Sequence, residues 1–305
     1  MNTLLNTNDA LEIVAEHYAL TDLDYCMFIE RGFNDTYLIA TEHKKYIFRI
    51  YLNGKYYIDS NTAYQFELDL LDHLHTRGIP VANAVRNKRN ELLGTTATSL
   101  GDRAFALFNY ADGRSLRGRS ITVEQCYQLG VAMADMHLAA NLFSTTHKRY
   151  TLDTNYLIDE PLRLISEFSE QRLQNDEVKS LVERGQHIVQ RLQPIDEMID
   201  VVNTITLNND EFGIIHADLH PGNLHFHGEN LTMFDFDHCA YGWRAYDLSI
   251  AYHYRSTQCD SIIKGYESRR PLSEQERKSL QCFSNLRNLW DIGDTLATLN
   301  LREET

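Results

Sequence analysis

Residues 214–237 read IIHADLHPGNLHFHGENLTMFDFD, and the pattern in this stretch is the main indication of the fold. Three short apolar segments, residues 213–215, 224–226 and 231–236, are separated by polar turns that include Pro221-Gly222. Asp218, Asn223 and Asp235 therefore fall at the ends of predicted strands or in a tight Pro-Gly loop. Rigid neighbours at such places can direct polar side chains to one point, so we expect these three to converge.

Two carboxylates and one amide in this pattern suit phosphoryl transfer from a nucleotide, a reaction that mainly demands positioning and charge neutralisation from the protein. Mg²⁺ takes hard oxygen ligands, which a carboxylate and an amide oxygen supply. A further carboxylate can orient an acceptor hydroxyl and take its proton. The alternative for Asp218 and Asn223 is a structural Asx turn around Pro221-Gly222, but the apolar strand that leads into Asp235 and Asp237 favours catalysis.

The rest of the chain divides into a strand-rich part and a helical part. Alternating or β-branched residues predict strands at residues 24–30, 36–41, 45–51, 84–87 and 104–110. A helical period appears at residues 61–77, with Gly78 at the position of a C-cap. From residue 121 onward helices are predicted at residues 123–142, 161–168, 178–192 and 272–301. The fold class is therefore α+β, with a composition shift near residues 110–113.

The pattern HxDxxxxN, followed by an apolar strand ending in DxD, resembles the signature of the aminoglycoside phosphotransferase and choline kinase superfamily of small-molecule kinases. The resemblance implies a bilobal, protein-kinase-like fold, with a small β-rich nucleotide-binding lobe at residues 1–109 and a larger, mainly helical catalytic and substrate-binding lobe at residues 110–305. It also implies that Asp218 is the catalytic base, that His216 supports it, and that Mg²⁺ is bound by Asn223, Asp235 and Asp237. Asp247 resembles the Asp that the family places at the start of its next helix.

The resemblance extends into the first part of the chain. RGFNDTYLI (residues 31–39) resembles the nucleotide-binding loop, KYIFRIY (45–51) the strand with the phosphate-contacting base, and FALFNYADGRSL (105–116) the hinge between lobes. By this resemblance ATP is bound by Gly32, Asn34, Thr36, Arg49, Glu67, Asn109 and Tyr110. Arg49 stands where protein kinases carry Lys, and a guanidinium can bind phosphate through two N–H groups. The alternative for Arg49 and Glu67 is an ordinary ion pair between strand and helix.

The sequence is compatible with several phosphate acceptors. With 43 acidic against 29 basic residues the net charge is −14, which disfavours nucleic acid and anionic membranes as partners and favours an amine-bearing small molecule with a hydroxyl group. Members of the superfamily phosphorylate aminoglycosides, choline, methylthioribose or homoserine, and YGWRAYD (residues 241–247) resembles the homoserine-kinase-like and stress-kinase-like branches. The alternatives are a Ser/Thr protein kinase and a catalytically silent kinase-like scaffold.

Histidines crowd the same stretch, but no HExxH or CxxC motif accompanies them, so we expect structural or solvated histidines rather than a zinc site. Five scattered cysteines, the absence of a signal-peptide pattern in residues 1–14 and the lack of a long apolar segment predict a cytoplasmic protein. We expect a monomer or homodimer. Near the C-terminus, Arg287 and Trp290 lie in a helical pattern that predicts core packing, with lining of the acceptor pocket as the alternative.

Overall fold

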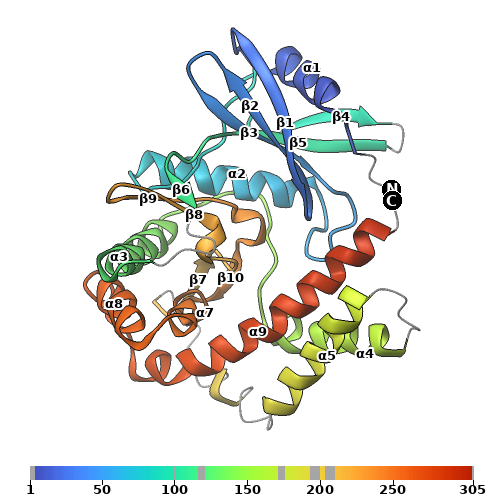
Figure 1. The fold of residues 1–305 in the computed structure, drawn as a ribbon. Coiled ribbons are helices and arrows are strands. Elements are labelled where there is room, and N and C mark those ends of the chain that lie inside the picture. The colour runs from blue at the N-terminus through green and yellow to red at the C-terminus, as the bar shows by residue number, and fades with distance from the viewer. Residues whose placement is uncertain are drawn as a thin grey trace.

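The computed structural model describes residues 4–98, 101–115, 121–170, 176–192, 200–202 and 210–303. These residues form two lobes, one built on an antiparallel sheet and the other mainly helical (Figure 1). The α+β, two-lobe architecture predicted from the sequence is confirmed. None of the described helices is long and apolar enough to cross a membrane.

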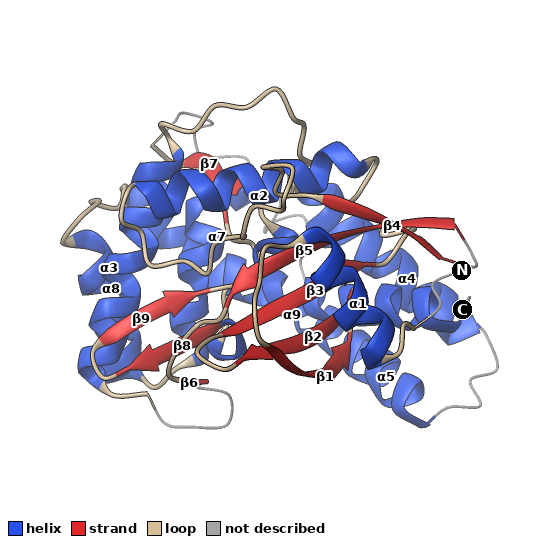
Figure 2. Cartoon of the chain, turned by 90° about the horizontal axis from the view of Figure 1, so that it is seen from above, coloured by secondary structure: helices blue, strands red, loops and turns tan. Residues whose placement is uncertain are grey.

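The N-terminal lobe is a five-stranded antiparallel sheet in the order β1-β2-β3-β5-β4. Helix α1 (Thr7–His17) covers one face, and α2 (Asn61–Thr76) lies on the side that faces the second lobe (Figures 1 and 2). The alternation of apolar residues along the strands places Tyr37, Phe48 and Phe105 in a core beneath α1. The strand bounds are β1 Leu23–Arg31, β2 Asn34–Thr41, β3 Lys45–Tyr51, β4 Gly94–Thr98 and β5 Gly101–Asn109.

Two features of this lobe differ from the expectation. Residues 84–87 were predicted as a strand, but they make only an isolated bridge between Ala84 and Phe108. The edge strand is β4 instead, in which the short sequence GTTAT pairs with β5. The prediction was wrong because residues 81–85 divide their backbone hydrogen bonds between both lobes, with Ala82 donating to Met233 and Val85 to Leu107.

The C-terminal lobe packs helices around two small sheets. Helices α3 (Val123–Ala140) and α8 (Ser256–Glu267) can approach closely because each has a glycine without a Cβ at the contact. A Cβ at Gly130 would collide with the Ile262 carbonyl, and one at Gly265 would collide with the Tyr127 carbonyl. The long helix α9 (Glu274–Glu303) runs through this lobe (Figure 1) and contacts several other helices. The remaining helices are α4 Glu160–Glu170, α5 Asp176–Arg191 and α7 Arg244–Leu248, with a π-helical turn at Asn155–Asp159 and 3-10 turns at Pro221–Asn223, Phe236–His238 and Ser249–His253.

The two small sheets hold the stretch that the sequence singles out. Strand β7 (Phe212–Ile215) pairs with β10 (Ala240–Trp243), while β8 (Leu224–His227) pairs with β9 (Asn230–Met233) and with β6 (Arg114–Ser115). β6 follows the connection from the N-terminal lobe, where Gly113 has φ +107° and lies against the Phe226 carbonyl. This pairing fixes the connection against β8, the strand that follows residues 216–223.

Candidate active site

The loop of residues 216–223, here named the catalytic loop, is held from behind by Asp247. The Asp247 carboxylate is fully buried and accepts hydrogen bonds from the backbone N–H groups of His216 (2.7 Å) and Ala217 (2.9 Å) and from His137 Nε2 (3.1 Å). Ala217 has φ +67°, a left-handed conformation that costs a non-glycine residue roughly 1–2 kcal/mol. Asp247 therefore stabilises a strained bend immediately before Asp218.

His216 supports the same bend from within the loop. Its Nδ1 accepts a hydrogen bond from the Asp218 N–H (3.3 Å), so Nε2 carries the proton and donates to the Phe234 carbonyl (3.0 Å). Burial lowers the pKa of His216, which agrees with a neutral ring. This histidine ties the catalytic loop to the residue before Asp235 and is fully buried.

Asp218 and Asn223 lie together across the Pro221-Gly222 turn. Asn223 Nδ2 donates both to the Asp218 carbonyl (3.0 Å) and to Asp218 Oδ2 (3.1 Å). Because its nitrogen is engaged in this way, the amide oxygen of Asn223 is left for another partner. Arg287 from α9 donates to the Leu219 carbonyl (2.9 Å) and lies 3.7 Å from Asp218 Oδ1.

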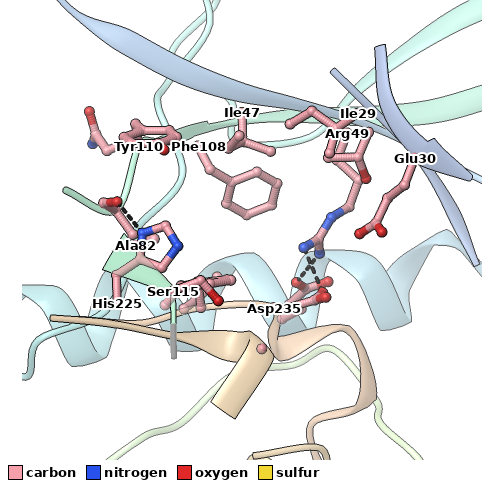
Figure 3. A pocket seen from close by; sticks show the side chains of 17 residues that line it. Ile29, Glu30, Ile47, Arg49, Ala82, Phe108, Tyr110, Ser115, His225 and Asp235 are labelled. Atoms are coloured by element: carbon pink, nitrogen blue, oxygen red, sulfur yellow. Dashed lines mark hydrogen bonds and ion pairs between the residues drawn. The ribbon is translucent and has the colours of Figure 1, made fainter. Parts of the chain in front are cut away.

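Arg49 connects the N-terminal sheet to the loop after β9. Its Nη1 donates to Glu67 Oε1 on α2 (2.9 Å) and its Nη2 to Asp235 Oδ1 (2.7 Å), as the dashed lines in Figure 3 show for Asp235. The guanidinium is 4.8 Å from the centre of the Phe108 ring, and its Nε is buried without a hydrogen-bond partner among the described residues. Asp235 has a left-handed backbone (φ 64°, ψ 61°) and a side chain that is 39% exposed.

Asp237, only two residues further on, lies in a different environment. It is 3% exposed, and its carboxylate accepts hydrogen bonds from Lys55, Asn34 and Tyr57. Burial alone would favour the protonated acid, but the positive charge of Lys55 holds the pKa of Asp237 well below its usual value.

Two adjoining cavities separate the lobes. The first, of about 330 Å³, lies between Phe108 and Arg49 on the sheet side and His225 and Asp235 opposite (Figure 3). The second, of about 160 Å³, contains Asp218 and Asp294, and it shares Glu30, Thr36 and Arg49 with the first. Of the predicted site residues, the first cavity is lined by Thr36, Arg49, Glu67, Asn109, Tyr110 and Asp235, and the second by Gly32, Asn34, Thr36, Arg49, Asp218, Asp235 and Asp237.

The electrostatics of the second cavity are dominated by carboxylates. Burial raises the pKa of Asp218 to about 8, with repulsion from Asp235 adding to the effect and Arg287 opposing it. Burial together with repulsion from Asp218 also raises the pKa of Asp294 well above its usual value. A positive charge that entered this cavity would relieve both effects.

Sequence reasoning did not find Lys55, Tyr57 or Asp294. Asp294 accepts a hydrogen bond from Tyr56 (3.0 Å), and no sequence motif marks any of these positions. Among the described residues no group of three His, Cys, Asp or Glu side chains is arranged to hold a metal. Trp290 packs edge-on against His238 in the core rather than lining either cavity.

Comparisons with known proteins show the family and the fold to which the chain is similar. A homoserine kinase of Rhizobium etli is 28% identical over 287 residues, which cover 91% of this chain and 81% of that protein, and an uncharacterised protein of Synechocystis is 30% identical over 95% of this chain and 78% of its own. Two solved structures share the kinase-like fold. The first is a microcompartment-associated aminopropanol kinase, with a TM-score of 0.70 and 21% identity over 97% of this chain and 93% of its own. The second is the amicoumacin kinase hAmiN in complex with AMP-PNP, Ca²⁺ and Ami. It has a TM-score of 0.72 and 22% identity, and the match covers 98% of this chain and 93% of its own. Residues 27–277 match the model of the phosphotransferase enzyme family, and the chain therefore belongs to this family of kinases.

Proposed function

We propose that this protein is an ATP- and Mg²⁺-dependent kinase that transfers the γ-phosphoryl group to a hydroxyl of a small, amine-bearing molecule, with Asp218 as the catalytic base. One observation carries the proposal. Asp218, Arg49 and Asp235, which come from three separate segments, all line the second cavity. Phosphoryl transfer needs a base, a phosphate-binding cation and a metal ligand in one place.

The first cavity fits a nucleotide. Its size falls at the lower end of small-molecule pockets, and Ile47, Leu71 and Phe108 give it apolar walls suited to a purine. Asn109 and Tyr110, where β5 ends and the connection between the lobes begins, also line this cavity. Arg49 has a buried Nε without a partner, which a phosphate oxygen would satisfy.

Asn223 and Asp235 fit a divalent cation. The hydrogen bonds of the Asn223 nitrogen leave its oxygen available, and the partly exposed Asp235 lines both cavities. Two oxygen ligands with the rest supplied by water and phosphate is the usual mode of Mg²⁺ binding. When bound, ATP would supply the phosphoryl group, and Mg²⁺ would neutralise part of the negative charge of the phosphates.

Asp218 is placed to receive the acceptor's proton. It lies in the second cavity, and Asn223 fixes its orientation through Oδ2. A raised pKa makes this carboxylate a stronger base than an ordinary aspartate once it is ionised. Arg287, 3.7 Å away, stabilises the ionised form.

The second cavity supports a small acceptor with an ammonium group. Five carboxylates line it against two basic side chains: Glu30, Asp218, Asp235, Asp237 and Asp294 against Arg49 and His238. Its volume suits an amino alcohol or an amino acid such as homoserine better than an aminoglycoside. The relatives named homoserine kinase and the aminopropanol kinase structure favour the same chemistry.

We further propose that the lobes divide between residues 109 and 110, where β5 ends, and that the protein acts in the cytoplasm as a monomer or homodimer. ATP is abundant in that compartment, and both cavities are formed within one chain.

The test is an ADP-release assay over amino alcohols, amino acids and aminoglycosides, with wild type and Asp218→Ala. We expect turnover with an amine-bearing acceptor, less with the matched alcohol that lacks the amine, and none above background in Asp218→Ala, which retains nucleotide binding. Wild-type turnover by the variant would overturn the role of Asp218.

A further inference from the structure

We propose that Asp237 is not a metal ligand but a positioning residue. It forms a buried ion pair with Lys55, and this pair anchors the turn between β1 and β2 against the C-terminal lobe. The proposal rests on the proposed function, because it concerns how the nucleotide site is held. It also replaces the expectation from the sequence that Asp237 binds Mg²⁺.

Both oxygens of the Asp237 carboxylate already have hydrogen-bond donors. Oδ1 accepts from Lys55 Nζ (3.0 Å), and Oδ2 accepts from Lys55 Nζ (2.8 Å), Asn34 Nδ2 (3.0 Å) and Tyr57 Oη (3.0 Å). A carboxylate offers about two acceptor sites on each oxygen, so Oδ2 is fully engaged and Oδ1 shares the Lys55 ammonium with it. Oδ2 could bind a cation only by displacing donors, all three of which belong to buried residues.

Lys55 is equally committed. Its side chain is fully buried, and Nζ donates to Asn34 Oδ1 (2.7 Å) in addition to both oxygens of Asp237. The ammonium also lies about 5 Å from the ring centres of Tyr51 and Tyr64. If Asp237 turned to a metal, Lys55 would remain as a buried cation without its counter-charge, which is strongly unfavourable.

Asp235 shows the contrasting environment. Its side chain is 39% exposed against 4% for Asp237, and it has one ion pair, with Arg49, that a phosphate group can take over. The left-handed backbone at Asp235 turns the chain. The two aspartates therefore lie in different surroundings, although only one residue lies between them. The carboxylate accessible to a cation is therefore Asp235.

The pair joins three separate segments of the chain. Asn34 begins β2, Lys55 lies between β3 and α2, and Asp237 lies in the 3-10 turn after β9. Phe33, from the same β1–β2 turn, packs against Tyr57 and His238 with ring centres 5.4 Å apart in both cases. The turn that lines the second cavity is thus fixed to the segment that contains Asp235.

The test compares Asp237→Asn with Asp235→Asn, two isosteric changes in the same segment. Mn²⁺ bound per chain is counted by EPR with saturating AMP-PNP, and the affinity for a fluorescent ADP analogue is measured with Mn²⁺ and again in EDTA. We expect Asp237→Asn to keep the wild-type Mn²⁺ count and to weaken ADP binding by a similar factor in both conditions, because the β1–β2 turn is held less firmly. Asp235→Asn should lose Mn²⁺.

Lys55→Gln provides a second route to the same result, and it remains informative if Asp237→Asn does not fold. It should weaken ADP binding in EDTA by the same factor as Asp237→Asn, and the double variant should be no weaker than either alone. Loss of one Mn²⁺ in Asp237→Asn, or weakened ADP binding only when Mn²⁺ is present, would overturn the proposal. Failure of the wild type to bind AMP-PNP at all would overturn the proposed function itself.

Discussion

Replacing Asp247 by Asn tests whether the catalytic loop is held in a strained conformation from behind. The carboxylate accepts the Ala217 N–H on Oδ1, and the His216 N–H and His137 on Oδ2. An asparagine has a single acceptor oxygen. In the less costly orientation this oxygen keeps the two donors on the Oδ2 side, and the new NH₂ group faces the Ala217 N–H.

The expected magnitude follows from that one lost hydrogen bond. A buried donor left without an acceptor costs about 1–3 kcal/mol, so the free energy of unfolding should fall by that amount. Ala217, at φ +67°, loses the contact that holds it and relaxes, which displaces Asp218. A misplacement of about 1 Å can cost about 10²-fold in rate, so we expect kcat to fall about 100-fold with nucleotide affinity unchanged.

The assay pairs urea unfolding followed by circular dichroism with steady-state kinetics, and Glu276→Gln serves as the matched control. Glu276 is 1% exposed and pairs with Arg270 at 2.7 Å, away from both cavities. Loss of this ion pair in Glu276→Gln should lower the free energy of unfolding and leave kcat unchanged. If Asp247→Asn retains wild-type turnover, or if Glu276→Gln loses turnover to the same degree, the reasoning about loop strain is refuted.

The same variant has a defined dependence on pH. Burial favours protonated Asp247, but the hydrogen bond from His137 holds the pKa of Asp247 below its usual value. A depressed carboxylate pKa contributes stability above the unfolded value of about 3.9, and this stability is lost as the pH falls through the folded value. The stability difference between wild type and Asp247→Asn should therefore narrow in acid.

Three other predictions concern nucleotide binding, packing and the base. Arg49→Lys cannot bond Glu67 and Asp235 through two separate nitrogens, so the affinity for ADP, measured by titration, should fall about 10–100-fold, the equivalent of one hydrogen bond to a charged group at about 1.5–3 kcal/mol; an unchanged affinity would show that Arg49 does not bind phosphate. Gly130→Ala should lose about 1–3 kcal/mol of stability through collision with the Ile262 carbonyl, whereas Gly32→Ala, with no atom within 4 Å of the added Cβ, should lose none in the same thermal unfolding experiment. Because Asp218 accepts a proton only when ionised, kcat/KM should rise with pH and level off above pH about 8. Arg287→Met should move this inflection to higher pH, and an inflection that stays in place would contradict the contact.

Local patterns account for the elements that the sequence predicted. KYIFRIY alternates over its whole length and forms β3 at Lys45–Tyr51, and the helical period at residues 61–77 gives α2 at Asn61–Thr76. The proximity of Asp218 and Asn223 is also local, because they are only five positions apart and the Pro-Gly turn lies between them. Such features depend on neighbours in the chain, so the sequence alone is sufficient to predict them.

The missed residues depend on contacts between distant segments. Lys55 and Asp237 are 182 positions apart, and Tyr56 and Asp294 are 238 apart. Lys55 lies in the connection NGKYYI, which as sequence is an unremarkable polar turn. A buried lysine is recognisable only once the rings around it and its acidic partner are placed in space, since exposed lysines far outnumber buried ones.

The segment from Asp235 to Asp237 is one of the places where the two lobes are in contact, and its two acids pair with different parts of the N-terminal lobe. Asp235 pairs with Arg49, which is fixed to α2 through Glu67, while Asp237 pairs with Lys55 and Asn34. Both links run from the N-terminal lobe to one short stretch of backbone, but only the Arg49 link lies in the nucleotide cavity. If the proposed function holds, nucleotide and metal that displace the Arg49–Asp235 pair would leave the buried Lys55–Asp237 pair in place. The β1–β2 turn would then keep its position during nucleotide exchange.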